Sequence, residues 1–226
     1  MKIITFVSLA ALTLPASLLA ATTDEGYYAA ARYLNTQQRA ADQDTSSRPG
    51  VGQFTEGKTK QRSNNLALAF GYQFGNGWRS EAEYVLRKSA EYTSGSTAFP
   101  TSENHLQTHT TRVMLNVYRD YALRDDVSLY ATAGLGVSKI TAEGWQGNST
   151  RQYAEATNNN LTWGLGAGIS YSPVEHLSLD AGYRYTDMGN ISSGYNQFTN
   201  VRRLKDEQMK ARLTNSEWLL GARYLF

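Results

Sequence analysis

The stretch from Leu161 to Tyr185, LTWGLGAGISYSPVEHLSLDAGYRY, decides the fold. It contains two runs separated by a short break at residues 172–176, which includes Pro173. In each run apolar residues alternate with small or polar ones, and this period of two is the pattern of a β-strand. A soluble sheet with one solvated face would alternate in the same way, but runs of about ten residues match the length that a tilted strand needs to cross a bilayer. The apolar sets are Leu161, Trp163, Leu165, Ala167, Ile169 and Tyr171, then Leu177, Leu179, Ala181, Tyr183 and Tyr185.

The same alternation recurs along the rest of the chain and raises the expected number of strands to eight. Short connections, such as the hairpin signal Gly75-Asn76-Gly77, alternate with long polar segments. This asymmetry is typical of outer-membrane barrels, and closure removes the unpaired strand edges that hydrocarbon would not tolerate. We therefore expect an all-β fold, a closed antiparallel eight-stranded transmembrane β-barrel with four long extracellular loops and three short periplasmic turns. The other six strands are expected at residues 26–34, 65–74, 78–88, 110–118, 127–138 and 212–226, and the long loops at 35–63, 89–109, 141–159 and 187–211.

Composition agrees with this class of fold. The chain has 226 residues, enough for one barrel domain, with 15 Tyr, 19 Gly and only 4 Pro. A mean hydropathy of −0.49 is too low for a helical membrane protein. No Cys is present, which excludes disulfides and thiolate metal sites. A formal net charge of +2 gives no strong attraction to nucleic acid.

The N-terminus has the features of a secretory signal peptide. Lys2 supplies the positive region, and an apolar segment ending in small residues follows it. We expect residues 1–20 to be the signal peptide and residues 21–226 the barrel, with an uncleaved membrane anchor as the alternative.

The C-terminus resembles the insertion signal of outer-membrane barrels. Gly221, Tyr224 and the terminal Phe226 follow that signal, although Leu219 stands where a polar residue is usual. With the Gly-alternating strands, the chain resembles the opacity and OmpA-type eight-stranded barrels, and in size the adhesins of the Tia and heat-resistant-agglutinin type. The resemblance implies a Gram-negative outer-membrane location and, as partners, membrane lipid, lipopolysaccharide and the insertion machinery. We expect a monomer.

Several charged residues fall on the expected inner face. Six Arg and four carboxylates in that position must be paired and hydrogen-bonded. A gated pore or a catalytic carboxylate pair is the alternative, but the interior of an eight-stranded barrel is only wide enough for side chains to fill it. We expect a polar core built from Arg32, Arg79, Glu81, Glu83, Arg87, Arg112, Asp180, Arg184, Glu217 and Arg223.

The histidines raise the question of chemistry. His105 and His109 lie four residues apart near Glu103, and His176 lies in a turn. A zinc site needs three or four convergent ligands, and a hydrolase needs a His beside a nucleophile. Since neither pattern is present, we expect no catalytic residue, cofactor or metal, and no enzyme.

Basic residues in the expected loops are the candidate ligand-binding groups. They could bind acidic or sulfated polysaccharide on a host surface, or bridge lipopolysaccharide phosphates, or be merely solvated. We expect an adhesin- or invasin-like surface protein, with a structural outer-membrane protein or a narrow pore as alternatives. The candidate residues are Lys58, Lys60, Arg62, Arg202, Arg203 and Lys205, with Phe54, Phe99, Trp145, Tyr153, Tyr195 and Phe198 as further contacts.

Overall fold

A computed structural model describes residues 25–43, 46–48, 50 and 52–226. The expected signal peptide lies outside these residues. None of the described residues belongs to a helix long and apolar enough to cross a membrane. The strands are β1 (Gly26–Ala41), β2 (Ser47–Arg48), β3 (Gly52–Glu56), β4 (Lys60–Phe74), β5 (Trp78–Ser96), β6 (Asn104–Ala122), β7 (Val127–Gln146), β8 (Asn148–Val174), β9 (Leu177–Ser192) and β10 (Lys210–Leu225).

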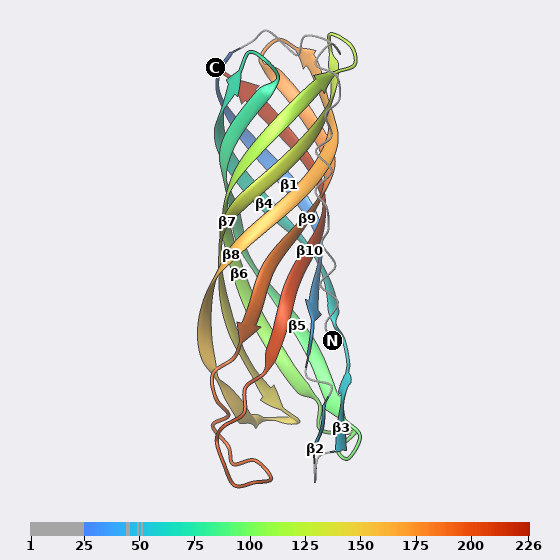
Figure 1. Cartoon of the computed structure of the whole chain (residues 1–226), viewed down its shortest axis with the longest axis vertical. Coiled ribbons are helices and arrows are strands. Elements are labelled where there is room, and N and C mark those ends of the chain that lie inside the picture. The colour runs from blue at the N-terminus through green and yellow to red at the C-terminus, as the bar shows by residue number, and fades with distance from the viewer. Residues whose placement is uncertain (1–24, 44–45, 49, 51) are drawn as a thin grey trace, which may run out of the picture.

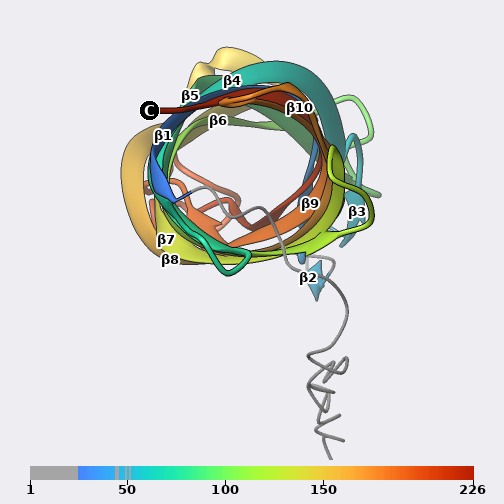
Figure 2. The same ribbon diagram turned by 90° about the horizontal axis from the view of Figure 1, so that it is seen from above.

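The long strands close into one antiparallel barrel (Figures 1 and 2). β1 lies between β4 and β10, and each further strand pairs with the next one until β5 pairs with β6 and closes the circle. The short strand β3 pairs with the far end of β5, and β2 pairs with β3. The eight-stranded antiparallel barrel expected from the sequence is confirmed.

Alternate residues of each strand face outward and inward, as expected. Leu68, Leu115 and Leu220 on the outer surface are 57%, 66% and 62% exposed, whereas the residue before each of them in the chain is buried in the lumen. So many exposed apolar side chains are compatible with a hydrocarbon surrounding and not with water. Aromatic residues gather on the outer surface near one end of the barrel, where an interfacial belt is expected; they include Tyr27, Phe74, Trp78, Tyr171 and Tyr224.

The two ends of the barrel differ. At one end the strands are joined by residues 75–77, 123–126 and 175–176, which confirms the short turns. We call this the turn end and the opposite one the loop end. At the loop end the connections are shorter than the sequence analysis expected, because the strands continue through most of the polar segments. β7 and β8 are separated there by Gly147 alone, whose φ of 70° suits a glycine.

The polar segments form strands because their residues still alternate between the two faces of the barrel wall. The composition of the faces is exchanged, with polar residues outside and apolar residues inside. In the membrane section of β7, Leu135 and Val137 face outward, but beyond it Ile140 and Ala142 are fully buried inside and Lys139 faces outward. An outer face that meets water needs polar residues, and the lumen then takes the apolar ones. They form a cluster inside the loop-end half, made of Ala40, Tyr92, Leu106, Ile140, Ala142, Met188, Ile191, Ala211 and Leu213.

The alternation gives a direct test of the register. Leu68→Arg places a charge on the lipid-facing surface and should lower the free energy of unfolding by about 2–4 kcal/mol if the residue lies near the bilayer midplane. Ala69→Ser, on the inner face of the same strand, should cost much less. Urea unfolding in lipid vesicles measures both, and equal costs would mean that the two faces of β4 are exchanged.

Candidate functional site

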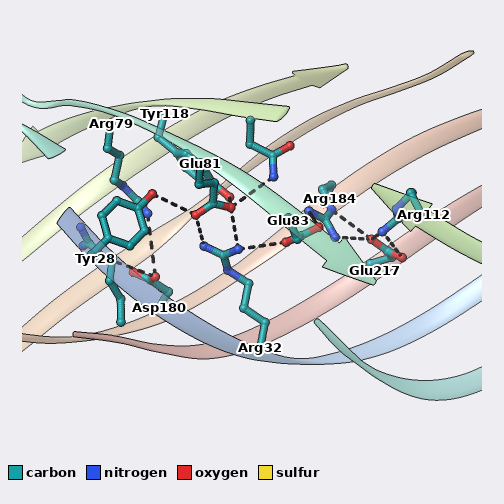
Figure 3. A network of polar contacts seen from close by, with 12 residues as sticks. Tyr28, Arg32, Arg79, Glu81, Glu83, Arg112, Tyr118, Asp180, Arg184 and Glu217 are labelled. Atoms are coloured by element: carbon teal, nitrogen blue, oxygen red, sulfur yellow. Dashed lines mark hydrogen bonds and ion pairs between the residues drawn. The ribbon is translucent and has the colours of Figure 1, made fainter. Parts of the chain in front are cut away.

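Five arginines and five carboxylates are buried together in the lumen, each 8% exposed or less. The formal charges therefore cancel. Figure 3 shows the part of this network around Arg32, Glu81 and Glu217. Burying an unpaired charge is strongly unfavourable, so the balance is a condition for this core to exist. The residues are Arg32, Arg79, Arg112, Arg184 and Arg223 with Glu81, Glu83, Asp120, Asp180 and Glu217.

The buried charged residues differ from the expected set at two positions. Arg87, expected inside, is exposed, because β5 has a register shift between Val85 and Lys88 that moves it off the inner face. Asp120 was expected in a turn, but β6 continues to Ala122 and carries the carboxylate inward. An expected set of six arginines and four carboxylates thus becomes five of each.

One part of the network is a continuous row of salt bridges across the lumen. Arg32 of β1 lies 2.6 Å from Glu81 and 2.9 Å from Glu83 of β5. Arg184 of β9 then joins Glu83 at 2.7 Å to Glu217 of β10 at 2.9 Å. Arg112 of β6 ends the row with a second contact to Glu217, also at 2.9 Å. The alternating signs give every carboxylate of this row a guanidinium partner.

A second part lies nearer the turn end. Arg79 donates to Asp120 at 2.9 Å, lies 4.0 Å from Asp180, and its guanidinium stacks 4.0 Å above the Tyr118 ring. The Tyr118 hydroxyl donates to Glu81 at 2.7 Å and so connects the two parts. Arg223 completes this part, 3.9 Å from Asp180. This arrangement is a packed polar core, and with the apolar cluster it fills the lumen at two levels.

The candidate basic residues fall into two separate groups, all exposed. Lys60 and Arg62 lie on β4, and Lys58 precedes that strand. Arg202, Arg203 and Lys205 lie in the connection between β9 and β10, where Arg202 pairs with Asp206 at 2.9 Å.

The β4 group has a member that sequence reasoning missed. Arg39 faces outward on β1 directly opposite Lys60, and Gln37 lies opposite Arg62. The sequence predicts a strand that ends at residue 34, because the residues that follow are polar like those of a loop. We call Arg39, Lys60 and Arg62 the outer basic cluster. No ion pair among the described residues involves any of the three.

His105 and His109 lie on the outer face of the loop-end half, and His176 lies in a turn at the opposite end. His109 shares a 2.7 Å hydrogen bond with Ser89, and its other ring nitrogen is 3.7 Å from Glu143, beyond hydrogen-bond distance. His105 contacts Glu91 at 2.8 Å and stacks on Trp145 at 4.7 Å. Within the described part of the chain, no three His, Cys, Asp or Glu side chains are placed to hold a metal.

The expected insertion signal lies on the last strand. Phe226 is 68% exposed, and its backbone amide donates to the Tyr27 carbonyl at 2.9 Å. The Tyr224 ring contacts that of Phe226 at 5.6 Å between centroids. Gly221 also has a packing role, because a Cβ there would lie 2.9 Å from Cγ of Arg32.

A closed barrel with an apolar outer band and a charged, filled lumen is an integral β-barrel of a bacterial outer membrane. The family described as "Outer membrane protein beta-barrel domain" matches residues 6–226, and the chain belongs to this family. It is an outer-membrane protein, and in such barrels the short turns face the periplasm and the opposite end faces outward. Its signal peptide, insertion signal, monomeric state and lack of catalytic, cofactor and metal sites stay predictions.

Relatives and solved structures agree with the family. The chain is 27% identical over 124 residues to outer membrane protein PagN of Salmonella typhimurium, which covers 53% of the chain and 51% of PagN. It is 36% identical over 76 residues to virulence membrane protein PagC of the same organism, covering 32% of the chain and 38% of PagC. The chain thus spans about half or less of the length of these relatives.

Two solved barrels share the fold. Neisserial surface protein A covers 89% of the chain and 97% of its own length, with a TM-score of 0.53 and 17% identity. OprG of Pseudomonas aeruginosa covers 91% of the chain and 98% of its own length, with a TM-score of 0.57 and 13% identity.

The salt-bridge row predicts a large effect of removing one shared carboxylate. Glu217→Ala leaves Arg112 and Arg184 buried without that partner, which should cost about 3–5 kcal/mol of unfolding free energy. Glu143→Ala removes a carboxylate from the exposed outer face and should cost less than about 1 kcal/mol. Urea unfolding in vesicles measures both, and similar midpoints would show that the row does not stabilise the barrel.

Because Phe226 is largely exposed, a substitution there can test its role in assembly without much effect on packing. Phe226→Ala should slow insertion in cells but leave the unfolding free energy of the purified barrel nearly unchanged, because the ring is largely exposed and the backbone bond to Tyr27 is kept. Trp78→Ala, at the same end but outside the terminal pattern, is the control for assembly. Unchanged insertion kinetics of Phe226→Ala would refute the insertion signal.

Proposed function

We propose that this outer-membrane protein is an adhesin that binds acidic or sulfated polysaccharide through the outer basic cluster. The observation that carries the proposal is the placement of Arg39 directly opposite Lys60, with Arg62 next on the same face of β4. Like charges directly opposite each other destabilise a sheet, so the fold gains nothing from this arrangement. A polyanion would remove the repulsion.

The geometry of the cluster suits a linear polyanion. Opposed residues in an antiparallel pair have Cβ atoms about 5 Å apart, and alternate residues of one strand are about 6.7 Å apart. The three cations therefore form a compact patch that adjacent acidic groups of a polysaccharide can contact together. Because they lie on strands and not on long loops, little ordering is needed on binding, which favours affinity.

The group between β9 and β10 is the weaker candidate. Arg202 already has a carboxylate partner in Asp206, so part of its charge is neutralised within the loop. Arg203 and Lys205 are exposed and could add contacts to a bound polymer. The description of PagC as a virulence membrane protein fits a role at the host surface for a related chain.

Lipopolysaccharide is the second candidate partner, and the height of the cluster favours it. Arg62 lies four residues beyond Leu66, an exposed apolar residue of the outer band, which is about 13 Å along the strand. A distance of this size along the tilted strand supports a position near the phosphate layer above the hydrocarbon. A structural role in that layer would need no host ligand.

We favour a binding protein over a pore or an enzyme. The salt-bridge network and the apolar cluster occupy the lumen at successive levels, which opposes conduction. The Ser89–His109 hydrogen bond is the nearest approach to a catalytic arrangement, and its carboxylate partner is 3.7 Å away.

Neutralising the cluster tests the proposal. Arg39→Gln, Lys60→Gln and Arg62→Gln together should weaken binding to heparin-coated beads and to cells about tenfold, since three exposed contacts of about 0.5 kcal/mol each sum to one factor of ten. Raised salt should reproduce the loss in the wild type. The matched control combines Arg202→Gln, Arg203→Gln and Lys205→Gln and should lose less.

The outcome also separates the two partners. If the triple variant binds cells and heparin as the wild type does but its outer membrane admits more of a large antibiotic, the cluster serves lipopolysaccharide and the adhesion proposal fails. Equal amounts of heat-modifiable folded barrel must be present in every strain compared.

A further inference from the structure

The loop end holds a cavity of about 440 Å³. This volume lies within the range of about 300–1,000 Å³ that small-molecule sites occupy. Its wall includes the segment that follows β1, β3, the loop-end parts of β5, β6, β7 and β8, and the connection between β9 and β10. It faces outward and lies apart from the outer basic cluster, none of whose members lines it.

One polar side chain in the wall has an unmet bonding need. Asn104, at the start of β6, is only 8% exposed, and its Oδ1 has no hydrogen-bond partner among the described residues. Leaving a buried polar atom unpaired is unfavourable. A ligand that brings a hydrogen-bond donor to Asn104 would recover that lost free energy.

A fixed cation lies in the same wall. The Arg151 guanidinium donates to Gln146 at 2.7 Å and stacks 4.3 Å above the Phe198 ring, while its Nε has no partner among the described residues. The wall thus offers an orphan acceptor and an orphan donor, each on an immobilised side chain. A ligand that carries several hydroxyls can donate a hydrogen bond to Asn104 and accept one from Arg151.

Aromatic side chains supply flat apolar surfaces beside these groups. Phe54, Phe99, Tyr92 and Tyr153 line the cavity, and Phe99 is 46% exposed. The Tyr92 hydroxyl donates to Gln38 at 2.6 Å, and burial raises its pKa, so it stays protonated and is already used. Since Tyr92 and Tyr153 are buried, Phe99 is the ring whose face is open for C–H groups of a ligand to pack on.

The charges of the wall cancel, unlike those of the outer basic cluster. Asp42, Asp206 and Glu207 are matched in number by Arg151, Arg202 and Lys210. A net charge of zero gives no electrostatic preference for a polyanion. Unpaired hydrogen-bonding groups, aromatic faces and charge balance together suit a neutral ring that carries several hydroxyls.

We propose that this cavity binds a neutral saccharide unit, one pyranose face packing on Phe99 and its hydroxyls bonding to Asn104 and Arg151. This site is distinct from the polyanion surface proposed above and does not depend on it. A peptide is the competing occupant, but the absence of a net charge and the polar atoms of Asn104 and Arg151 left unpaired within the described chain favour the sugar.

The test uses the full-length chain purified in detergent micelles. An array of neutral and sulfated oligosaccharides identifies binders, and saturation-transfer NMR with methyl β-galactoside and methyl N-acetyl-β-glucosaminide measures contact. We expect at least one neutral saccharide to bind, with affinity unchanged between about 0.1 and 0.5 M salt because no ionic contact is released.

Substitutions locate the site. Phe99→Ala and Asn104→Ala should each lower the affinity at least tenfold, whereas Tyr195→Ala, an exposed aromatic outside the wall, should not. Phe99 lies in a connection between strands, so its variant keeps the proposal testable if Asn104→Ala folds poorly. The outer-cluster triple variant should lose heparin binding and keep the neutral saccharide.

Three results would overturn the inference. They are the absence of any neutral binder on the array, binding unaffected by Phe99→Ala, and displacement of the saccharide by an unrelated peptide. Failure of heparin binding alone would contradict the adhesin proposal and leave this one standing.

Discussion

The pairing of five buried arginines with five carboxylates is the interaction on which the rest of the barrel depends. It joins β1, β5, β6, β9 and β10 across the lumen, so strands distant in the wall are held by contacts through its centre. The large side chains need space, and inner-face glycines of the remaining wall supply it. A Cβ at Gly168 would clash with the Tyr130 hydroxyl. The glycines of the deciding stretch are therefore part of the same core.

The medium around each half of the barrel decides which face of a strand is apolar. In hydrocarbon the outer face must be apolar and the charges turn inward, whereas beyond the membrane the outer face is polar and the lumen is apolar. β10 shows both, with Leu220 and Trp218 outward in one half and Leu213 buried in the other. Each half thus has its own core, one of paired charges and one of apolar side chains, and paired strands continue beyond the apolar outer band.

The sequence predicted the strands that cross the membrane, because a period of two with apolar outer residues is visible residue by residue. It placed Arg32, Glu81 and Glu217 inside correctly, but it could not foresee the register shift that expels Arg87. The loop-end parts of the strands were expected to be loops. Their polar outer residues and scattered apolar inner residues give only a weak strand pattern. The outer basic cluster depends on the pairing of β1 with β4, and Asn104 and Arg151 carry no pattern at all.

Strand extension changes what the outer end of the barrel can do. A charge on a paired strand keeps its position, so under the proposed function the outer basic cluster would attract a polyanion at the range of the Debye length, about 8 Å at physiological salt, without ordering a loop first. The cavity acts only at contact, where orphan polar atoms and aromatic faces discriminate between ligands of the same charge. The outer basic cluster, which would act at long range, and the cavity, which would act at contact, lie on different parts of the barrel. A polymer carrying both acidic groups and neutral sugar ends could therefore engage both surfaces, and its avidity would exceed either affinity where the spacing allows simultaneous contact.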